Sequence, residues 1–225
     1  MLLKIGHRGA PTLVPENTVE GFHKAAAFGV HGVEFDIHLC SSGEPVVIHD
    51  DTVDRTTYGT GKVAKLTLKQ LRKLEVRGGG YIPTLAEVFD VLGEEFYYFI
   101  EIKAAKAAIP VAKMVSGLVK KGWKAERLTI ISFQHEALQA VKRKFPALCI
   151  GASFEELKAG DIAIAKKIGA GAIVPHYKEI TVKDIQEAHK AGLKVIVWTV
   201  NETPDIIRMG TMGVDGIISD HPERL

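Results

Sequence analysis

The feature that most constrains the fold is a unit that recurs along the chain: a helix-like segment, a glycine, and a short apolar run that ends in polar residues. It occurs at residues 28–36, 168–176, 191–198 and 212–220. In the last three copies the glycines are 23 and 21 residues apart, close to the length of one βα unit. A glycine just past a helix, followed by a buried strand, is typical of such units. The pattern therefore predicts parallel strands that alternate with helices.

Nine runs along the chain have the composition of strands, one more than an eight-stranded barrel needs. They are residues 2–5, 33–38, 46–48, 97–102, 128–132, 148–152, 172–174, 194–200 and 216–219. The third run follows the second too closely for a parallel crossover, which takes about a dozen residues. We therefore interpret it as the return arm of a hairpin, which opens an insertion at about 40–83 before a helix over 85–92. The predicted fold is α/β: a TIM (β/α)8 barrel, one domain over residues 1–225, with a small insertion after the second strand.

Composition excludes several classes of protein. The chain of 225 residues is 46% hydrophobic and 25% charged, as expected for a domain with a large core. A net charge of +2 does not indicate nucleic-acid binding. Cys40 and Cys149 lack the spacing of a metal site and are expected to be free thiols. No apolar run approaches the ~20 residues of a membrane span, so stable membrane insertion is not expected, and no signal peptide is visible. We expect a cytoplasmic location.

The run from residue 32 to 38 alternates acidic and apolar residues. Side chains two residues apart share one face of a strand, so Glu34 and Asp36 point the same way, about 7 Å apart. Like charges this close raise each other's pKa unless a cation lies between them. The pattern indicates a metal site, although an edge strand with a solvated polar face would show it too.

Polar residues also follow the other predicted strands, where barrel enzymes place their active sites. Glu34, Asp36 and Glu101 together suit a hard divalent cation with oxygen ligands, Mg²⁺ or Ca²⁺. The cysteines and histidines do not form a complete set of zinc ligands, so the sequence does not indicate a zinc site. Arg8 and Lys103 beside such a cation would hold an anion, for which phosphate is the natural candidate.

Two histidines, His7 and His49, follow predicted strands, and histidine is the residue type best suited to act as a general acid or a general base near neutral pH. Together with the carboxylates and the two cationic side chains, they indicate metal-assisted cleavage of a phosphoester. We expect Asp50 to orient His49, and Asn17 to cap or tie the first helix without touching substrate.

Ten short motifs, in order along nearly the whole chain, resemble the glycerophosphodiester phosphodiesterase family. The most specific are His-Arg-Gly with Glu-x-Asp, followed by His-Asp. The motifs are Gly6–Ala10, Pro15–Thr18, Val33–Asp36, Pro45–Asp50, Arg55–Thr56, Gly59–Gly61, Pro83–Leu85, Glu101–Lys103, Ser132–Phe133 and Val197–Asn201. The resemblance also supports the barrel with a short insertion.

This resemblance implies a role for each matched residue. It makes His7 and His49 the acid/base pair and Trp198 a wall of the glycerol pocket. It makes Arg8 and Lys103 ligands of phosphate, and Glu34, Asp36 and Glu101 ligands of a divalent cation, Mg²⁺ or Ca²⁺ with Mn²⁺ as an alternative. The implied reaction hydrolyses a glycerophosphodiester, such as glycerophosphocholine or glycerophosphoethanolamine, to sn-glycerol 3-phosphate and an alcohol, in glycerol and phospholipid metabolism. The nucleophile is either the glycerol 2-hydroxyl or water.

Two other functions are compatible with the residues. One is a metal-dependent barrel enzyme that acts on phospholipid or sphingolipid headgroups. The other is a barrel that binds anions without chemistry, which is disfavoured because all seven polar positions of the cluster are present. The basic segment over 62–77 is interpreted as a solvated helix face, with attraction of anionic substrates or headgroups towards the barrel mouth as the alternative. Because only a helical stub is expected after the last strand, a homodimer that covers this gap is left open.

Overall fold

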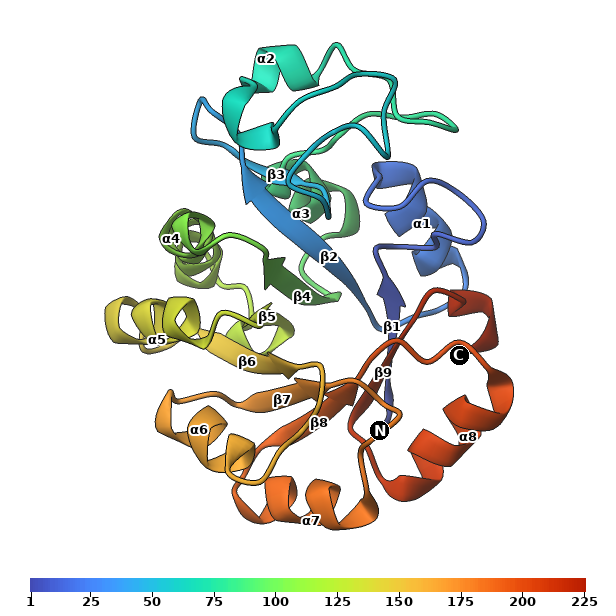
Figure 1. Cartoon of the computed structure of the whole chain (residues 1–225), viewed down its shortest axis with the longest axis vertical. Coiled ribbons are helices and arrows are strands. Elements are labelled where there is room, and N and C mark those ends of the chain that lie inside the picture. Colours follow the sequence, from blue (N-terminus) through green and yellow to red (C-terminus); the bar gives the residue numbers. More distant parts are fainter.

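Eight parallel strands close into a ring with helices around it, and a ninth strand lies outside the ring (Figure 1). The computed structural model describes residues 1–225. The ring runs β1-β9-β8-β7-β6-β5-β4-β2 and closes through the pairing of β1 with β2. The strands of the ring are β1 (Leu3–His7), β2 (Gly32–Leu39), β4 (Tyr97–Ile102), β5 (Leu128–Ser132), β6 (Cys149–Phe154), β7 (Ala172–Pro175), β8 (Lys194–Val197) and β9 (Gly216–Ser219). The predicted TIM barrel is confirmed, with strand bounds that differ by at most three residues.

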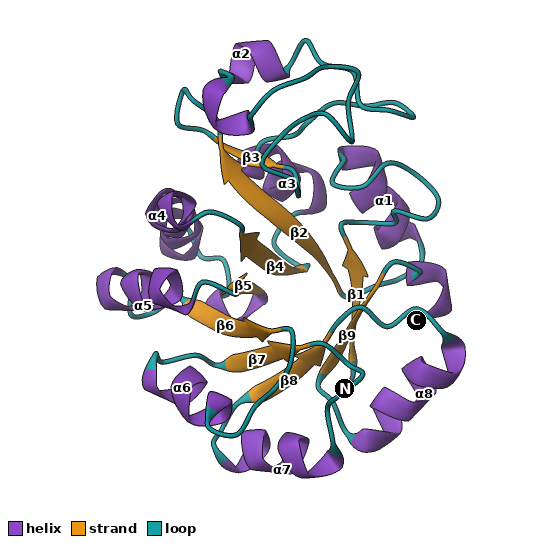
Figure 2. Cartoon of the chain, in the orientation of Figure 1, coloured by secondary structure: helices purple, strands orange, loops and turns teal.

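Helices connect the strands and form the outer layer of the barrel (Figure 2). They are α1 (Val19–Ala27), α3 (Leu85–Leu92), α4 (Ala108–Lys120), α5 (His135–Lys144), α6 (Asp161–Lys167), α7 (Val182–Lys190) and α8 (Thr203–Met212). Local sequence explains their ends. Thr181 and Asp184 form a reciprocal capping box before α7, and Gly213 ends α8 with a φ of 90°, a conformation that glycine adopts without strain. Only a 3₁₀ turn, Pro222–Arg224, follows β9. No helix is long and apolar enough to cross a membrane.

The insertion between β2 and α3, residues 40–84, is called the excursion below, and it has a small hydrophobic core of its own. Its strand β3 (Pro45–Val47) pairs antiparallel with β2, as the hairpin interpretation predicted. The basic segment does not form the long helix face that was expected. It contains one turn of α-helix, α2 (Leu68–Leu71), and a 3₁₀ turn, and its leucines pack into the excursion core while most of its lysines are exposed. The leucines lie too irregularly in sequence to build one continuous helical stripe.

The period-two alternation of the strands builds the barrel interior in two layers. A lower layer of seven apolar side chains fills the ring: Leu3, Ile5, Phe99, Ile131, Val174, Ile196 and Ile218. Polar residues lie two positions further along the same strands, on the same inward face: His7 follows Ile5, Glu101 follows Phe99. The outward residues Val33, Phe35 and Ile37 are fully buried between the sheet and the helices. The polar layer therefore rests on an apolar floor.

Candidate active site

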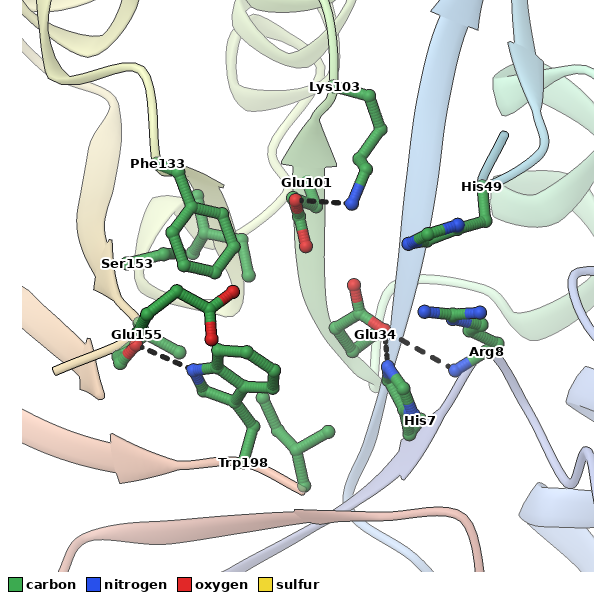
Figure 3. Close-up of a pocket in the computed structure, with 13 residues that line it drawn as sticks. His7, Arg8, Glu34, His49, Glu101, Lys103, Phe133, Ser153, Glu155 and Trp198 are labelled. Atoms are coloured by element: carbon green, nitrogen blue, oxygen red, sulfur yellow. Dashed lines mark hydrogen bonds and ion pairs between the residues drawn. The ribbon is translucent and has the colours of Figure 1, made fainter. Parts of the chain in front are cut away.

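Seven of the eight residues singled out from the sequence line one cavity at the carboxyl ends of the strands (Figure 3). They are His7, Arg8, Glu34, His49, Glu101, Lys103 and Trp198. The eighth, Asp36, is 1% exposed and lies within ion-pair distance of Arg8 and Lys103. Strand register explains the gathering: Glu34 pairs with His7 on β1, and Asp36 pairs with Glu101 on β4.

Three carboxylates form the acidic centre of the site. One oxygen from each of Glu34, Asp36 and Glu101 lies within 4.8 Å of the others. The side chains point into the ring and are not on a solvated edge, since Glu34 is only 2% exposed. Burial, followed by repulsion from Asp36 and Glu101, raises the pKa of Glu34 well above its usual range. Burial and Asp36 also raise the pKa of Glu101.

Asp36 differs from its two neighbours. Burial acts to raise the pKa of its carboxyl group, but attraction to Arg8 and Lys103 outweighs burial and lowers the pKa. Glu34 Oε1 and Asp36 Oδ1 are buried and accept no hydrogen bond. Buried carboxylate oxygens that accept no hydrogen bond are costly, and a hard divalent cation would satisfy them. The donor set therefore fits Mg²⁺ or Ca²⁺.

Two cationic side chains border the carboxylates. Lys103 Nζ lies 2.9 Å from Glu101 Oε1 and 3.4 Å from Asp36 Oδ1. Arg8 adopts a left-handed backbone conformation, with a φ of 50°, and its amide donates to Glu34 Oε2 at 3.3 Å. Its Nε lies 3.3 Å from Asp36 Oδ2. Both cations face the same cavity as the carboxylates, where an anion would meet two positive charges.

His7 is oriented by a residue from the other end of the chain. Its Nδ1 lies 2.6 Å from Asp220 Oδ1, and its Nε2 faces Glu34 at 3.6 Å. Asn201 Nδ2 donates to Asp220 Oδ2 at 2.8 Å, and Asn201 Oδ1 accepts from the Asp220 amide at 2.9 Å. Burial acts to raise the pKa of Asp220, but the hydrogen bonds from His7 and Asn201 lower it. Neither Asp220 nor Asn201 was assigned a role from the sequence.

His49 is oriented from the excursion. Its Nδ1 lies 2.7 Å from Asp50 Oδ1, and Arg55 donates to both oxygens of Asp50 at 2.7 and 3.0 Å. Arg55 also donates twice to Glu16 at 2.8 Å, and Glu16 in turn accepts from Arg8 at 3.2 Å. The hydrogen bond from Arg55 is the main cause of a strongly lowered pKa of Asp50. Burial lowers the pKa of His49. This chain of ion pairs links the excursion to Arg8.

An apolar wall closes the cavity opposite the cations. The Trp198 ring meets Phe133 edge to face, with ring centroids 5.5 Å apart, and Trp198 Nε1 donates to the Val174 carbonyl at 2.9 Å. Trp198 therefore lines the cavity, although a tryptophan on a strand usually belongs to the core. Glu155, which the sequence did not single out, lies on the same wall.

The prediction for Asn17 was only partly right. Thr18, and not Asn17, caps α1, because the Thr18 side chain accepts from the Gly21 amide. Asn17 instead donates to Asp36 Oδ2 at 2.9 Å, from a left-handed backbone conformation with a φ of 57°. It therefore holds one carboxylate of the acidic centre. The expectation for Asp50 agrees with its contact to His49.

Comparisons with known proteins point to one family. The profile of the Glycerophosphoryl diester phosphodiesterase family matches residues 7–224. A glycerophosphodiester phosphodiesterase of Caldanaerobacter subterraneus subsp. tengcongensis is 38% identical, over 99% of this chain and 96% of that protein. The crystal structure of a putative glycerophosphoryl diester phosphodiesterase from Silicibacter pomeroyi is similar, with a TM-score of 0.87, 30% identity, and coverage of 100% of this chain and 91% of that one. An Oleispira antarctica phosphodiesterase in complex with the product sn-glycerol-3-phosphate gives a TM-score of 0.89 at 26% identity, covering 99% and 95%.

Proposed function

The chain belongs to the glycerophosphoryl diester phosphodiesterase family, and from this membership we propose that it hydrolyses glycerophosphodiesters to sn-glycerol 3-phosphate and an alcohol in a metal-dependent reaction. One observation carries the proposal: carboxylates, cations and two oriented histidines converge on a single cavity. The product bound to the Oleispira antarctica phosphodiesterase supports the identity of the released phosphate ester.

The acidic centre is the proposed metal site. Glu34, Asp36 and Glu101 would hold Mg²⁺ or Ca²⁺, with Mn²⁺ as an alternative. The bound cation would polarise the phosphoryl group and neutralise part of its developing charge. The two buried oxygens that accept no hydrogen bond, Glu34 Oε1 and Asp36 Oδ1, support this assignment.

Arg8 and Lys103 are the proposed phosphate ligands. Each is already aligned by the carboxylates, so little reorganisation is needed when an anionic substrate enters. Their positive charges would hold the non-bridging oxygens and stabilise the negative charge that grows on them. Trp198 would pack against the carbon chain of glycerol on the apolar wall.

His7 and His49 are the proposed acid/base pair. One imidazole would take the proton of the nucleophile, either the glycerol 2-hydroxyl or water, and the other would protonate the departing alkoxide. In each ring a carboxylate fixes Nδ1, which leaves Nε2 for proton transfer. This shared arrangement suits both histidines to proton transfer through Nε2.

Four further expectations from the sequence stay predictions. They are a single catalytic domain over residues 1–225, a cytoplasmic location, the absence of nucleic acid as a partner, and a homodimer as an open alternative. Gel filtration with light scattering would decide the oligomeric state.

A coupled assay for glycerol 3-phosphate tests the function. We expect release from glycerophosphocholine or glycerophosphoethanolamine that EDTA abolishes and Mg²⁺, Ca²⁺ or Mn²⁺ restores. His7→Ala and His49→Ala should each lower kcat by about 10²- to 10⁴-fold. His23→Ala is the matched control, because His23 is exposed on α1 and away from the cavity. No release from folded protein, together with cleavage of a lysophospholipid, would refute the proposal in favour of a lipid headgroup enzyme.

A further inference from the structure

The cavity at the barrel mouth continues into an open groove beside β5 and β6. The cavity holds about 100 Å³ and the groove about 510 Å³, and Phe133, Ser153 and Glu155 line both. The cavity alone is smaller than the ~300–1,000 Å³ of typical ligand pockets. A glycerophosphodiester carries two alcohols on one phosphate. With glycerol against Trp198, the second alcohol would extend into the groove.

Charge is divided between the two walls of the cavity. The wall from β1, β2 and β4 carries both cations, Arg8 and Lys103, together with the acidic centre. The opposite wall is made of aliphatic and aromatic side chains, Ser153, and one charged residue, Glu155. Glu155 has no ion-pair or hydrogen-bond partner in the protein, whereas its neighbour Glu156 lies 3.5 Å from Lys158 Nζ. A negative charge thus stands free where the cavity opens into the groove.

Aromatic rings flank this charge. Phe133 is 37% exposed and meets Trp198 edge to face at an interplanar angle of 82°. In Figure 3 the Glu155 side chain points toward these two rings. An exposed aromatic face beside a carboxylate attracts an ammonium group through both cation–π and ionic interactions.

The buried hydroxyl of Ser153 is a second observation that indicates a ligand site in the groove. Ser153 is 3% exposed, it lines both the cavity and the groove, and its Oγ has no hydrogen-bond partner. His135 Nε2 lies 3.0 Å from the Ser153 carbonyl oxygen and holds the backbone here. An unpaired buried hydroxyl is costly, and a ligand oxygen would satisfy it.

From these observations, and resting on the phosphodiesterase function proposed above, we infer that the groove between Phe133 and Glu155 holds the leaving alcohol and favours alcohols that carry an ammonium group. Choline and ethanolamine are the simplest phospholipid alcohols of this class. Glu155 is the specificity-determining residue, because its carboxylate is the free charge at the entrance of the groove. Phe133 would contact the methyl or methylene groups beside the nitrogen.

Substrate competition tests this inference. We expect wild-type protein to cleave glycerophosphocholine with a higher kcat/KM than glycerophosphoglycerol, whose leaving alcohol is neutral. Glu155→Gln should lower kcat/KM for glycerophosphocholine about three- to tenfold, mainly through KM, and should change the value for glycerophosphoglycerol less than about twofold. Glu155→Lys should extend the loss. Glu179→Gln is the matched control, since Glu179 is an exposed glutamate in the loop after β7 that lines neither the cavity nor the groove.

The outcomes separate this inference from the function on which it rests. Cleavage of both diesters with equal loss in Glu155→Gln, or with no loss, would overturn the inference and leave the function standing. The same result for Glu179→Gln as for Glu155→Gln would also overturn it, because the loss would then reflect the general surface potential of the protein. No cleavage of either diester would refute the function itself.

Discussion

The variant Asp220→Asn tests whether Asp220 supports catalysis by orienting the His7 ring, while the His7 imidazole itself stays in place. The Asp220 carboxylate accepts from His7 Nδ1 at 2.6 Å through one oxygen and from Asn201 Nδ2 at 2.8 Å through the other. An asparagine amide has one acceptor oxygen and one donor nitrogen. Whichever way the amide turns, either Asn201 Nδ2 or His7 Nδ1 meets a donor. When the amide nitrogen of the new asparagine faces His7, Nδ1 has to act as the acceptor. The proton of His7 then moves to Nε2, the nitrogen that faces Glu34.

The magnitude follows from the lost hydrogen bond. A hydrogen bond to a charged group contributes about 1.5–3 kcal/mol, and each ~1.4 kcal/mol of transition-state free energy is a factor of about ten in rate. We therefore expect kcat to fall about 10- to 150-fold, with a KM close to that of wild type. His7→Ala should be at least as damaging, because proton transfer itself is lost.

The assay is steady-state release of glycerol 3-phosphate by wild type, both single variants and the double variant. If Asp220 acts through His7, then Asp220→Asn should change the rate of His7→Ala less than about twofold. Asp215→Asn is the matched control, because Asp215 makes a similar 2.8 Å contact with His189 outside the cavity. Wild-type kcat in Asp220→Asn, or an equal loss in both backgrounds, would refute the reasoning.

Three further perturbations probe the metal site, the ion-pair chain and the core. Glu34→Gln should weaken divalent-cation binding in calorimetry by tenfold or more, since it removes the charge of a buried carboxylate; unchanged affinity would exclude Glu34 as a ligand. Arg55→Ala should cost about 1 kcal/mol or less at pH 7, because solvent screens the pairs. The pKa values of Asp50 and Glu16 are lowered in the folded state, so this stability is present above the unfolded carboxyl pKa of about 4 and is lost as pH falls below it; urea titrations at pH 7 and pH 2.5 measure the difference. Ile130→Ala should cost about 2–5 kcal/mol in the same titrations, because Ile130 is 0% exposed, and a loss below about 1 kcal/mol would contradict its place in the core.

Most of the barrel could be predicted from the local pattern of helix, glycine and apolar strand. The glycine that follows most of the helices and the apolar run after it are separated by only a few residues, so short windows of sequence contain the whole signal. The basic segment was predicted less well, because its leucines serve a small separate core whose position depends on the hairpin of β2 and β3.

The inward face of each strand was also predictable, because side chains alternate with a period of two. Glu34 and Asp36 share a face in any strand that contains both, and Glu101 and Lys103 do so as well. Once a barrel is assumed, these residues must gather at the carboxyl ends of adjacent strands, as β2 and β4 are. The candidate cluster therefore followed from sequence and fold class alone, while its roles rest on the proposed function.

Sequence by itself determined which residue types stand at the strand ends, since that information is local. Only the tertiary structure decided which partners hold them. Asp220 reaches His7 because closure of the ring brings the last strand beside the first, 213 residues apart in the chain. Glu16 meets Arg55, 39 residues later, because the excursion folds back over the loop after β1. Glu155 and Phe133 share a groove because β5 and β6 are neighbours in the ring. Such contacts depend on the geometry of closure, which no short window of sequence encodes.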